Sequence, residues 1–182
     1  MKNFELFRNK SVSASELHAL LDKSGKAFHP PVDIEGLIKT LDISIDTRPD
    51  FKKIKVLGSI SIKDNAPIIW INRIANQQET RKRFTLAHEL GHYMLHLAPM
   101  SSWDKTDGFT DEKIGFNRDQ EWDYKEMEAN RFAAQILMPI DFVQLEYGKR
   151  KGSDKIVEEL ANVFDVSKLA MKYRLESLEL EI

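Results

Sequence analysis

His88, Glu89 and His92 are the residues whose types and spacing point most directly to chemistry, within the segment His88-Glu89-Leu90-Gly91-His92. Residues four apart lie on one face of a helix, so the two imidazoles can point at the same ion. Neutral imidazole nitrogens are common zinc ligands, and Glu89 is placed to reach a water at the metal without being a ligand itself. The H-E-x-x-H spacing therefore predicts a helical zinc site with hydrolytic chemistry.

The residues around this motif predict a buried helix. Apolar residues recur over 84–97, Glu79 and Thr80 stand near the expected start, and Pro99 ends the helix. Gly91 costs such a helix about 1 kcal/mol relative to alanine, which indicates a packing reason for a residue without a side chain. Two histidines that merely pack in a core helix are the alternative explanation.

A catalytic zinc usually takes three protein ligands, so the two histidines need a partner. The chain has no cysteine, which leaves histidine, aspartate and glutamate. Glu126 is favoured, because a helix over 123–137 places Asn130 one turn later on the same face, where its amide can support a ligand histidine. Glu128 points about 200° away around that helix, so only one of the two acids can face the site.

Three other residues near the motif have structural explanations as well as functional ones. His96 continues the spacing of four, but a straight helix places it about 12 Å along the axis from His88, which favours a packed or capping histidine. Tyr93, Tyr124 and His96 are candidates for stabilising an oxyanion, and a structural role is favoured for each.

The whole chain has the composition of a globular protein of one domain with a small appendage. It has 182 residues, of which 42% are hydrophobic and 31% charged, and its formal net charge of -2 does not favour a general binder of nucleic acid or membranes. The absence of cysteine and of a signal-peptide pattern near the start fits the cytosol. We therefore expect a cytoplasmic protein with no membrane partner.

The hydrophobic periodicity predicts an α+β fold. Alternation rich in isoleucine and valine predicts strands over 43–45, 54–62 and 67–72, the last two joined by a hairpin turn at 63–66. Residues 100–125 are expected to form a long polar loop. Helices are expected over 15–24, 33–41, 79–98, 123–137, 140–147, 154–164 and 167–178.

The strand over 67–72 directly precedes the motif helix. A strand in this position can pair with an extended substrate peptide through main-chain hydrogen bonds, which makes Ile69, Trp70 and Ile71 candidates for substrate binding. An ordinary structural strand explains the same residues equally well.

With both helices defined, the sequence resembles the ImmA/IrrE family of metallopeptidases. The matching segments are 83–92 and 126–139, with shorter matches over 31–34 and 164–175. The resemblance implies a zincin-like α+β fold, in which a small antiparallel or mixed sheet packs on the HExxH helix and the Glu-bearing helix, with a C-terminal helical pair. It also implies a single zinc ion on His88, His92 and Glu126, with Glu89 as the general base, although His/Glu sites accept manganese too.

The same resemblance implies an endopeptidase that cleaves a partner repressor of the helix-turn-helix class and so releases stress-response or mobile-element genes. The expected organisation is a helical arm over 1–27, a metallopeptidase domain over 28–147 and a helical appendage over 148–182 packed on that domain. A toxin–antitoxin-type or regulatory protein that holds zinc and acts by binding a repressor or DNA is the alternative function.

The last two expected helices resemble a helix-turn-helix, with Lys168, Lys172 and Arg174 on the second helix. The same segment carries glutamates at 158, 159, 176, 179 and 181, which oppose contact with phosphates. An ordinary helical hairpin that packs on the catalytic domain or docks a partner is therefore favoured over direct DNA binding.

Overall fold

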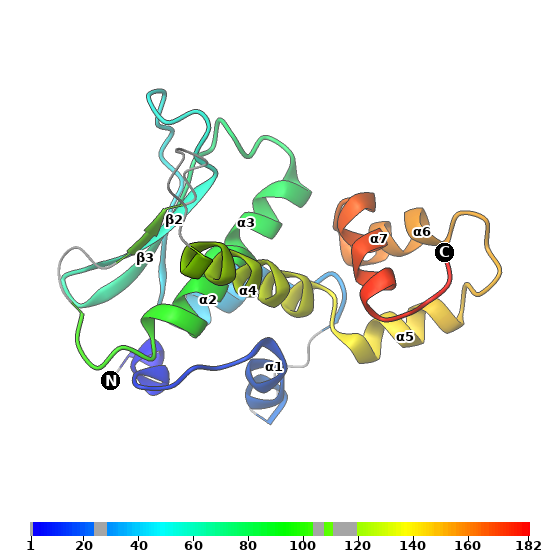
Figure 1. Ribbon diagram of the computed structural model, residues 1–182, viewed down its shortest axis with the longest axis horizontal. Coiled ribbons are helices and arrows are strands. Elements are labelled where there is room, and N and C mark those ends of the chain that lie inside the picture. Colours follow the sequence, from blue (N-terminus) through cyan, green and yellow to red (C-terminus); the bar gives the residue numbers. More distant parts are fainter. Residues whose placement is uncertain (1, 24–28, 104–107, 111–119) are drawn as a thin grey trace.

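The computed structural model describes residues 2–23, 29–103, 108–110 and 120–182, and it confirms the α+β class (Figure 1). A small sheet lies at one end of the long axis, the C-terminal helices lie at the other, and two long helices lie between them. The elements in chain order are η1 (Asn3–Phe7), α1 (Ala14–Lys23), α2 (Ile34–Thr40), β1 (Ser44–Asp46), β2 (Gly58–Lys63), β3 (Ala66–Ile71), α3 (Glu79–His92), η2 (Tyr93–Leu97), β4 (Gly108–Thr110), α4 (Gln120–Leu137), α5 (Ile140–Gly148), α6 (Ile156–Phe164) and α7 (Lys168–Ser177).

The sheet is mixed, as predicted, with the strand order β1-β3-β2-β4. β1 runs parallel to β3, and β2 runs antiparallel to both β3 and β4. The hairpin between β2 and β3 turns at Asp64 and Asn65, whose φ angles are 51° and 57°. Positive φ at both central residues is typical of the turn type that matches the twist of a two-residue hairpin.

The strand order corrects the interpretation of Ile69, Trp70 and Ile71 as substrate-binding residues. Ile69 pairs with Ile45 of β1 on one side and with Ile60 of β2 on the other. Trp70 likewise has a partner in both strands, and Ile71 pairs with β2. An extended peptide can add only to an unpaired edge of a sheet. Of the two alternatives, the structure therefore favours an ordinary structural role for β3.

The region expected as a long loop over 100–125 also contains regular structure. Residues 108–110 form β4 beside β2, and α4 begins at Gln120 rather than at residue 123. Trp103 is buried, and its indole nitrogen donates to the carbonyl of Leu97, 2.8 Å away. The side chains of Phe109, Phe116 and Trp122 in the same region lie outside the part of the chain that the structure describes.

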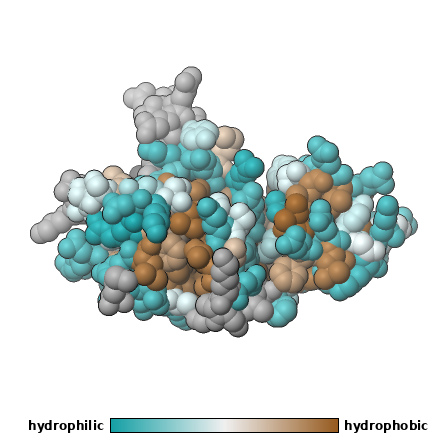
Figure 2. All heavy atoms as spheres, turned by 90° about the horizontal axis from the view of Figure 1, so that it is seen from below, coloured by the Kyte–Doolittle hydropathy of each residue, from teal (hydrophilic) through white to brown (hydrophobic). Residues whose placement is uncertain are grey.

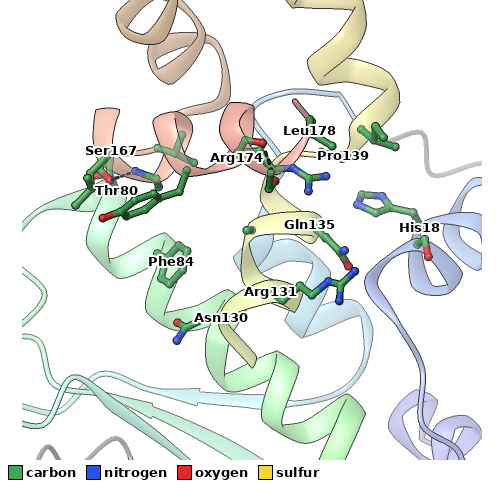
Figure 3. A pocket seen from close by; sticks show the side chains of 18 of the residues that line it. His18, Thr80, Phe84, Asn130, Arg131, Gln135, Pro139, Ser167, Arg174 and Leu178 are labelled. Carbon is green, nitrogen blue, oxygen red and sulfur yellow. Dashed lines mark hydrogen bonds between the residues drawn. The ribbon is translucent and has the colours of Figure 1, made fainter. Parts of the chain in front are cut away.

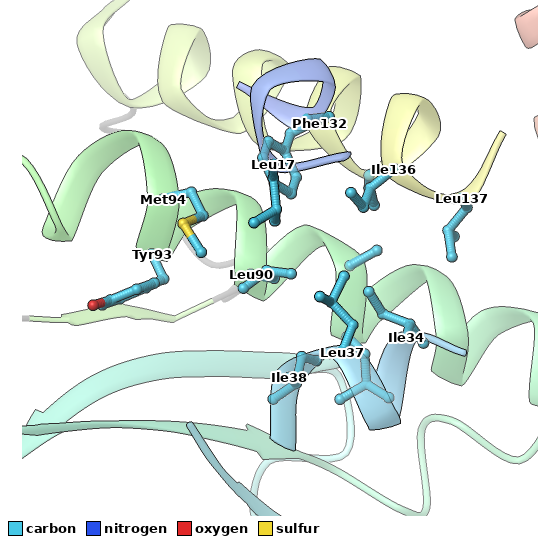
Figure 4. Close-up of a cluster of buried hydrophobic side chains, with 14 of the residues drawn as sticks. Leu17, Ile34, Leu37, Ile38, Leu90, Tyr93, Met94, Phe132, Ile136 and Leu137 are labelled. Carbon is cyan, nitrogen blue, oxygen red and sulfur yellow. The ribbon is translucent and has the colours of Figure 1, made fainter. Parts of the chain in front are cut away.

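α3 is the central helix, and its side chains are buried on all sides from Thr85 to His92. Apolar side chains from α1, α2, α3 and α4 meet around it (Figure 4). Leu90 and Leu17 are fully buried there, beside Phe132 of α4. Truncating such residues to alanine typically costs about 2–5 kcal/mol, so this core holds α3 and α4 rigidly against each other.

The predicted C-terminal helical pair is present as α6 and α7, which turn at Asp165 in a left-handed conformation. Arg83 of α3 is buried, donates to the carbonyls of Phe164 and Asp165, and forms an ion pair with the Asp165 carboxylate at 3.2 Å. Arg174 of α7 donates to the carbonyl of Met138. These bonds fix the C-terminal helices to α3 and to the end of α4.

Hydrophobic side chains also reach the surface at both ends of the molecule. Figure 2 shows two hydrophobic areas on one face, one over the part that carries the N-terminus and one over the C-terminal helices, with polar residues around them. None of the described helices is long and apolar enough to cross a membrane.

Candidate metal centre

His88 and His92 lie one turn apart on α3 and point to the same place. Their Nε2 atoms are 3.0 Å apart, and the residues are 6% and 1% exposed. Two imidazole nitrogens this close inside a protein need either a shared proton or a cation between them, because two lone pairs repel each other.

Glu126 of α4 completes the group. Its carboxylate oxygens lie 3.3 Å from His88 Nε2 and 3.1 Å from His92 Nε2. Among the residues that the structure describes, His88, His92 and Glu126 form the cluster of histidine and acidic side chains able to hold a metal ion. Three donor atoms from two helices thus converge on one point.

The spacing of these atoms fits a tetrahedral ion. For ligands about 2.0–2.1 Å from zinc, neighbouring corners of a tetrahedron are about 3.3 Å apart. The observed separations are 3.0, 3.1 and 3.3 Å. Two imidazoles and one carboxylate are also a donor set found in catalytic zinc sites, which leave the fourth position open.

Gly91 explains how α4 comes close enough to present Glu126. A Cβ atom at residue 91 would lie 3.1 Å from Phe132 Cβ and 3.2 Å from the Cα and carbonyl oxygen of Ala129. The two helices therefore touch at backbone distance, one turn from the ligands. This contact is the packing reason that the glycine in the motif helix indicated.

Glu128 and His96 contact each other beside this centre, and neither belongs to the cluster. His96 lies within the π-helical η2, so the straight-helix distance expected from sequence does not apply to it, and its ring centroid is 5.3 Å from that of His92. Its Nε2 lies 3.3 Å from the carbonyl oxygen of Lys125, and its Nδ1 lies 4.0 Å from a Glu128 oxygen. The structure brings Glu126, and not Glu128, next to the two motif histidines.

Asn130 lies one turn beyond Glu126, with its Oδ1 3.1 Å from His88 Nδ1. An amide oxygen accepts hydrogen bonds, so this contact assigns the proton of the neutral imidazole to Nδ1. The lone pair of Nε2 then faces Glu126 and His92. The hydrogen bond is the contact through which Asn130 would support His88 as a metal ligand, as the sequence suggested.

Glu89 is fully buried between α3 and the sheet. Its Oε1 would be 2.9 Å from a Cβ atom at Gly58, the first residue of β2. Thr85, one turn earlier on α3, donates to Asn76, which in turn donates to the carbonyl of Leu57. The sequence reasoning missed Gly58 and Asn76. A glycine inside the strand expected over 54–62 was the one available signal, because such glycines often mark a close approach.

Burial and the neighbouring charges set the protonation of the ligands. Desolvation lowers the pKa of His92 to about 4, so its ring is neutral at pH 7. Desolvation opposes ionisation of Glu126, but the close contacts of its carboxylate with the His88 and His92 rings outweigh it and lower the pKa of Glu126 to about 2. A neutral imidazole and an ionised carboxylate are the forms that bind a metal ion.

Tyr93, a candidate for stabilising an oxyanion, does not face the centre. It is fully buried, and its hydroxyl donates to the carbonyl of Phe4, 3.0 Å away. Burial raises the pKa of the Tyr93 hydroxyl. Packing therefore accounts for the position of Tyr93. Tyr124, another candidate, has a side chain that is 56% exposed.

The Gly58→Ala variant tests the contact between β2 and Glu89. The added methyl group would lie 2.8 Å from Thr85 Cγ2 as well as 2.9 Å from Glu89 Oε1, so we expect a loss of about 1–3 kcal/mol in the free energy of unfolding. Urea denaturation measures it. Gly148→Ala is the matched control, because its added methyl group meets nothing within 4 Å. Equal stability of the two variants would contradict the close approach.

Acidification is expected to destabilise the metal-free protein. The unfolded chain protonates histidine from pH 6.5, whereas folded His92 stays neutral down to about pH 4, so the unfolded state binds more protons in this window. Glu126 extends the loss from about pH 4.5 to about pH 2. Denaturation in chelator between pH 7 and 5 measures the slope. His92→Gln should make the slope shallower, and an unchanged slope in that variant would refute the assignment.

Comparison with known proteins agrees with this geometry. The family described as IrrE N-terminal-like domain, peptidase family M78, matches residues 42–176, which include all of α3 and α4. The comparison with curated proteins gives no significant match. Because the family match spans most of the chain and contains the whole His88, His92 and Glu126 cluster, the chain belongs to the M78 peptidases, the family that the ImmA/IrrE resemblance predicted.

Proposed function

We propose that this chain is a zinc-dependent endopeptidase whose substrate is a protein partner, a transcriptional repressor of the helix-turn-helix class. The observation that carries the proposal is the convergence of His88, His92 and Glu126, with Glu89 on the same helix. Membership of the M78 family supports peptidase chemistry. Cleavage of a repressor in the cytoplasm, with release of stress-response or mobile-element genes, is what the resemblance to ImmA/IrrE proteins implies.

In this proposal His88, His92 and Glu126 hold one zinc ion, and Asn130 fixes the orientation of His88. A zinc ion so held supplies Lewis-acid polarisation of the scissile carbonyl and lowers the pKa of water toward neutrality. Glu89 accepts a proton from the attacking water and transfers it to the departing amine nitrogen, so that one peptide bond and one water become a carboxylate and an amine. Burial of Glu89 keeps bulk water from competing for this proton.

The contacts of α7 do not favour direct DNA binding by the C-terminal helices. Lys168 forms an ion pair with Glu158 at 2.8 Å, and Lys172 lies 3.8 Å from Glu176. Lys168 and Lys172 therefore lie beside glutamates, and Arg174 is buried. The exposed face of α7 thus presents little positive charge to the phosphates of DNA.

Metal analysis by mass spectrometry, on protein purified without chelator, tests the ligand set. We expect about one zinc ion per chain in the wild type, much less in Glu126→Ala, and the wild-type amount in Glu128→Ala. Glu128 is the matched control, because it lies two residues away on the same helix and contacts His96 instead. Zinc retained by Glu126→Ala and lost from Glu128→Ala would reverse the assignment.

Glu89→Gln separates a peptidase from a protein that holds zinc and acts by binding. The amide cannot accept the water proton, so we expect unchanged zinc content and a fall of about 10²–10⁴-fold in the rate of cleavage. The assay incubates the protein with purified helix-turn-helix repressors of the source organism and follows fragments by mass spectrometry. Glu79→Gln, an exposed glutamate of α3, should cut at the wild-type rate. Cleavage by Glu89→Gln at that rate would rule out the mechanism, and wild-type protein that cuts none of the repressors would rule out this substrate class.

A further inference from the structure

A large groove lies beside the metal centre and is unused by the proposed chemistry. It has a volume of about 1290 Å³ and is bounded by α1, the first turns of α3, α4 and α7 (Figure 3). The three metal-binding side chains do not line it, but Asn130, the hydrogen-bond partner of His88, does. We call it the α4–α7 groove.

Two arginines, Arg131 and Arg174, line the floor of the α4–α7 groove and give it positive charge. Figure 3 shows the side chains of Arg131, Arg174, Gln135 and His18 extending toward one another across it. Arg174 is only 9% exposed, and its Nε donates to the carbonyl of Met138. Burial and the nearby Arg131 guanidinium together lower the pKa of Arg174, as expected for two like charges that face each other.

Neither guanidinium has an acidic partner within the described ranges. Arg174 makes the bond to Met138 and no ion pair there, and Arg131 makes neither a hydrogen bond nor an ion pair with the described residues. Asp22 and Asp141 also line the groove, but within the described residues neither carboxylate forms an ion pair with Arg131 or Arg174. Burying the Arg174 guanidinium without a counter-charge is costly, and the exposed Arg131 guanidinium lies beside it, so the pair indicates an anionic ligand.

The wall of the groove is apolar and accessible. Leu169 and Tyr173 lie four residues apart on one face of α7 and are 59% and 61% exposed. Phe84 of α3 and Ile140 of α5 also line it. Tyrosine and arginine are among the residues that are enriched in protein-binding hot spots, so Tyr173 beside Arg174 fits a docking surface.

The size of the groove favours a peptide over a small molecule. Sites for small ligands typically have volumes of about 300–1,000 Å³, which is smaller than this groove. A peptide segment that alternates carboxylates with apolar side chains would satisfy both the floor and the wall. Charge complementarity therefore selects an acidic amphipathic segment rather than a basic or neutral one.

We propose that the α4–α7 groove docks an acidic amphipathic segment of a protein partner. A carboxylate of the segment pairs with Arg131 and Arg174, and its apolar side chains pack on Leu169 and Tyr173. The assignment of this partner as the substrate rests on the proposed function, because the groove reaches Asn130 at the back of the metal centre. Binding itself needs no cleavage.

Selection from a random peptide library tests this proposal on the full chain carrying Glu89→Gln, so that hydrolysis does not interfere. Peptides that bind should be enriched in aspartate and glutamate next to apolar residues. Their affinity, measured by fluorescence polarisation, should fall at least tenfold in Arg131→Glu and in Tyr173→Ser. Both side chains are exposed, so these variants are expected to fold, which circular dichroism checks. Arg73→Glu is the control, because Arg73 is exposed and does not line the groove.

Two results would overturn the docking proposal. One is a set of selected peptides without acidic enrichment, or with equal affinity for wild type and Arg131→Glu. The other is a groove that binds inorganic phosphate with loss in Arg131→Glu while no peptide is selected, which would make it a site for a small anion. Repressor cleavage that is unaffected by Arg131→Glu would remove the groove from substrate recognition and leave the peptidase proposal standing.

Discussion

The contact between α3 and α4 at Gly91 is the constraint on which the metal centre depends. Neither helix carries the site alone: α3 holds two imidazoles and α4 holds the carboxylate. The 3.2 Å approach of a Gly91 Cβ position to the Ala129 backbone sets the helix separation, and Glu126 and Asn130 lie on either side of Ala129 in sequence. Close packing at a residue without a side chain thus allows the 3.3 and 3.1 Å distances from the Glu126 carboxylate to His88 and His92.

A second close contact positions Glu89 in the same way. Gly58 lets β2 approach Glu89, while Asn76 ties Thr85 of α3 to the carbonyl of Leu57 beside that strand. The sheet therefore serves as a rigid surface behind the motif helix and not as a docking edge at β3, whose Ile69 and Trp70 are paired on both sides. Rigid elements on both sides of α3 are what a preorganised hydrolytic site requires.

The parts of this structure that could be predicted from sequence are those specified by local spacing. Helical periodicity gave α3 and α4, and the 200° separation of Glu126 and Glu128 distinguished the acid at the centre from the acid beside His96. The position of β3 inside the sheet and the three-residue β4 depend on pairing between distant segments, which periodicity does not specify. Gly58 was missed for the same reason, because its importance lies in a side chain more than 30 residues away.

The α4–α7 groove shows the limit of such reasoning, since α1, α3, α4, α5 and α7 all contribute to it and no motif marks it. Its link to the centre runs through Asn130, whose backbone follows Ala129 at the tight contact with Gly91. Because α3 and α4 are in close contact at Gly91, a segment that bound in the groove and shifted α4 would also displace Glu126. We infer that the groove serves to hold a partner close to the centre, raising its effective concentration there, rather than to switch the geometry of the metal ligands.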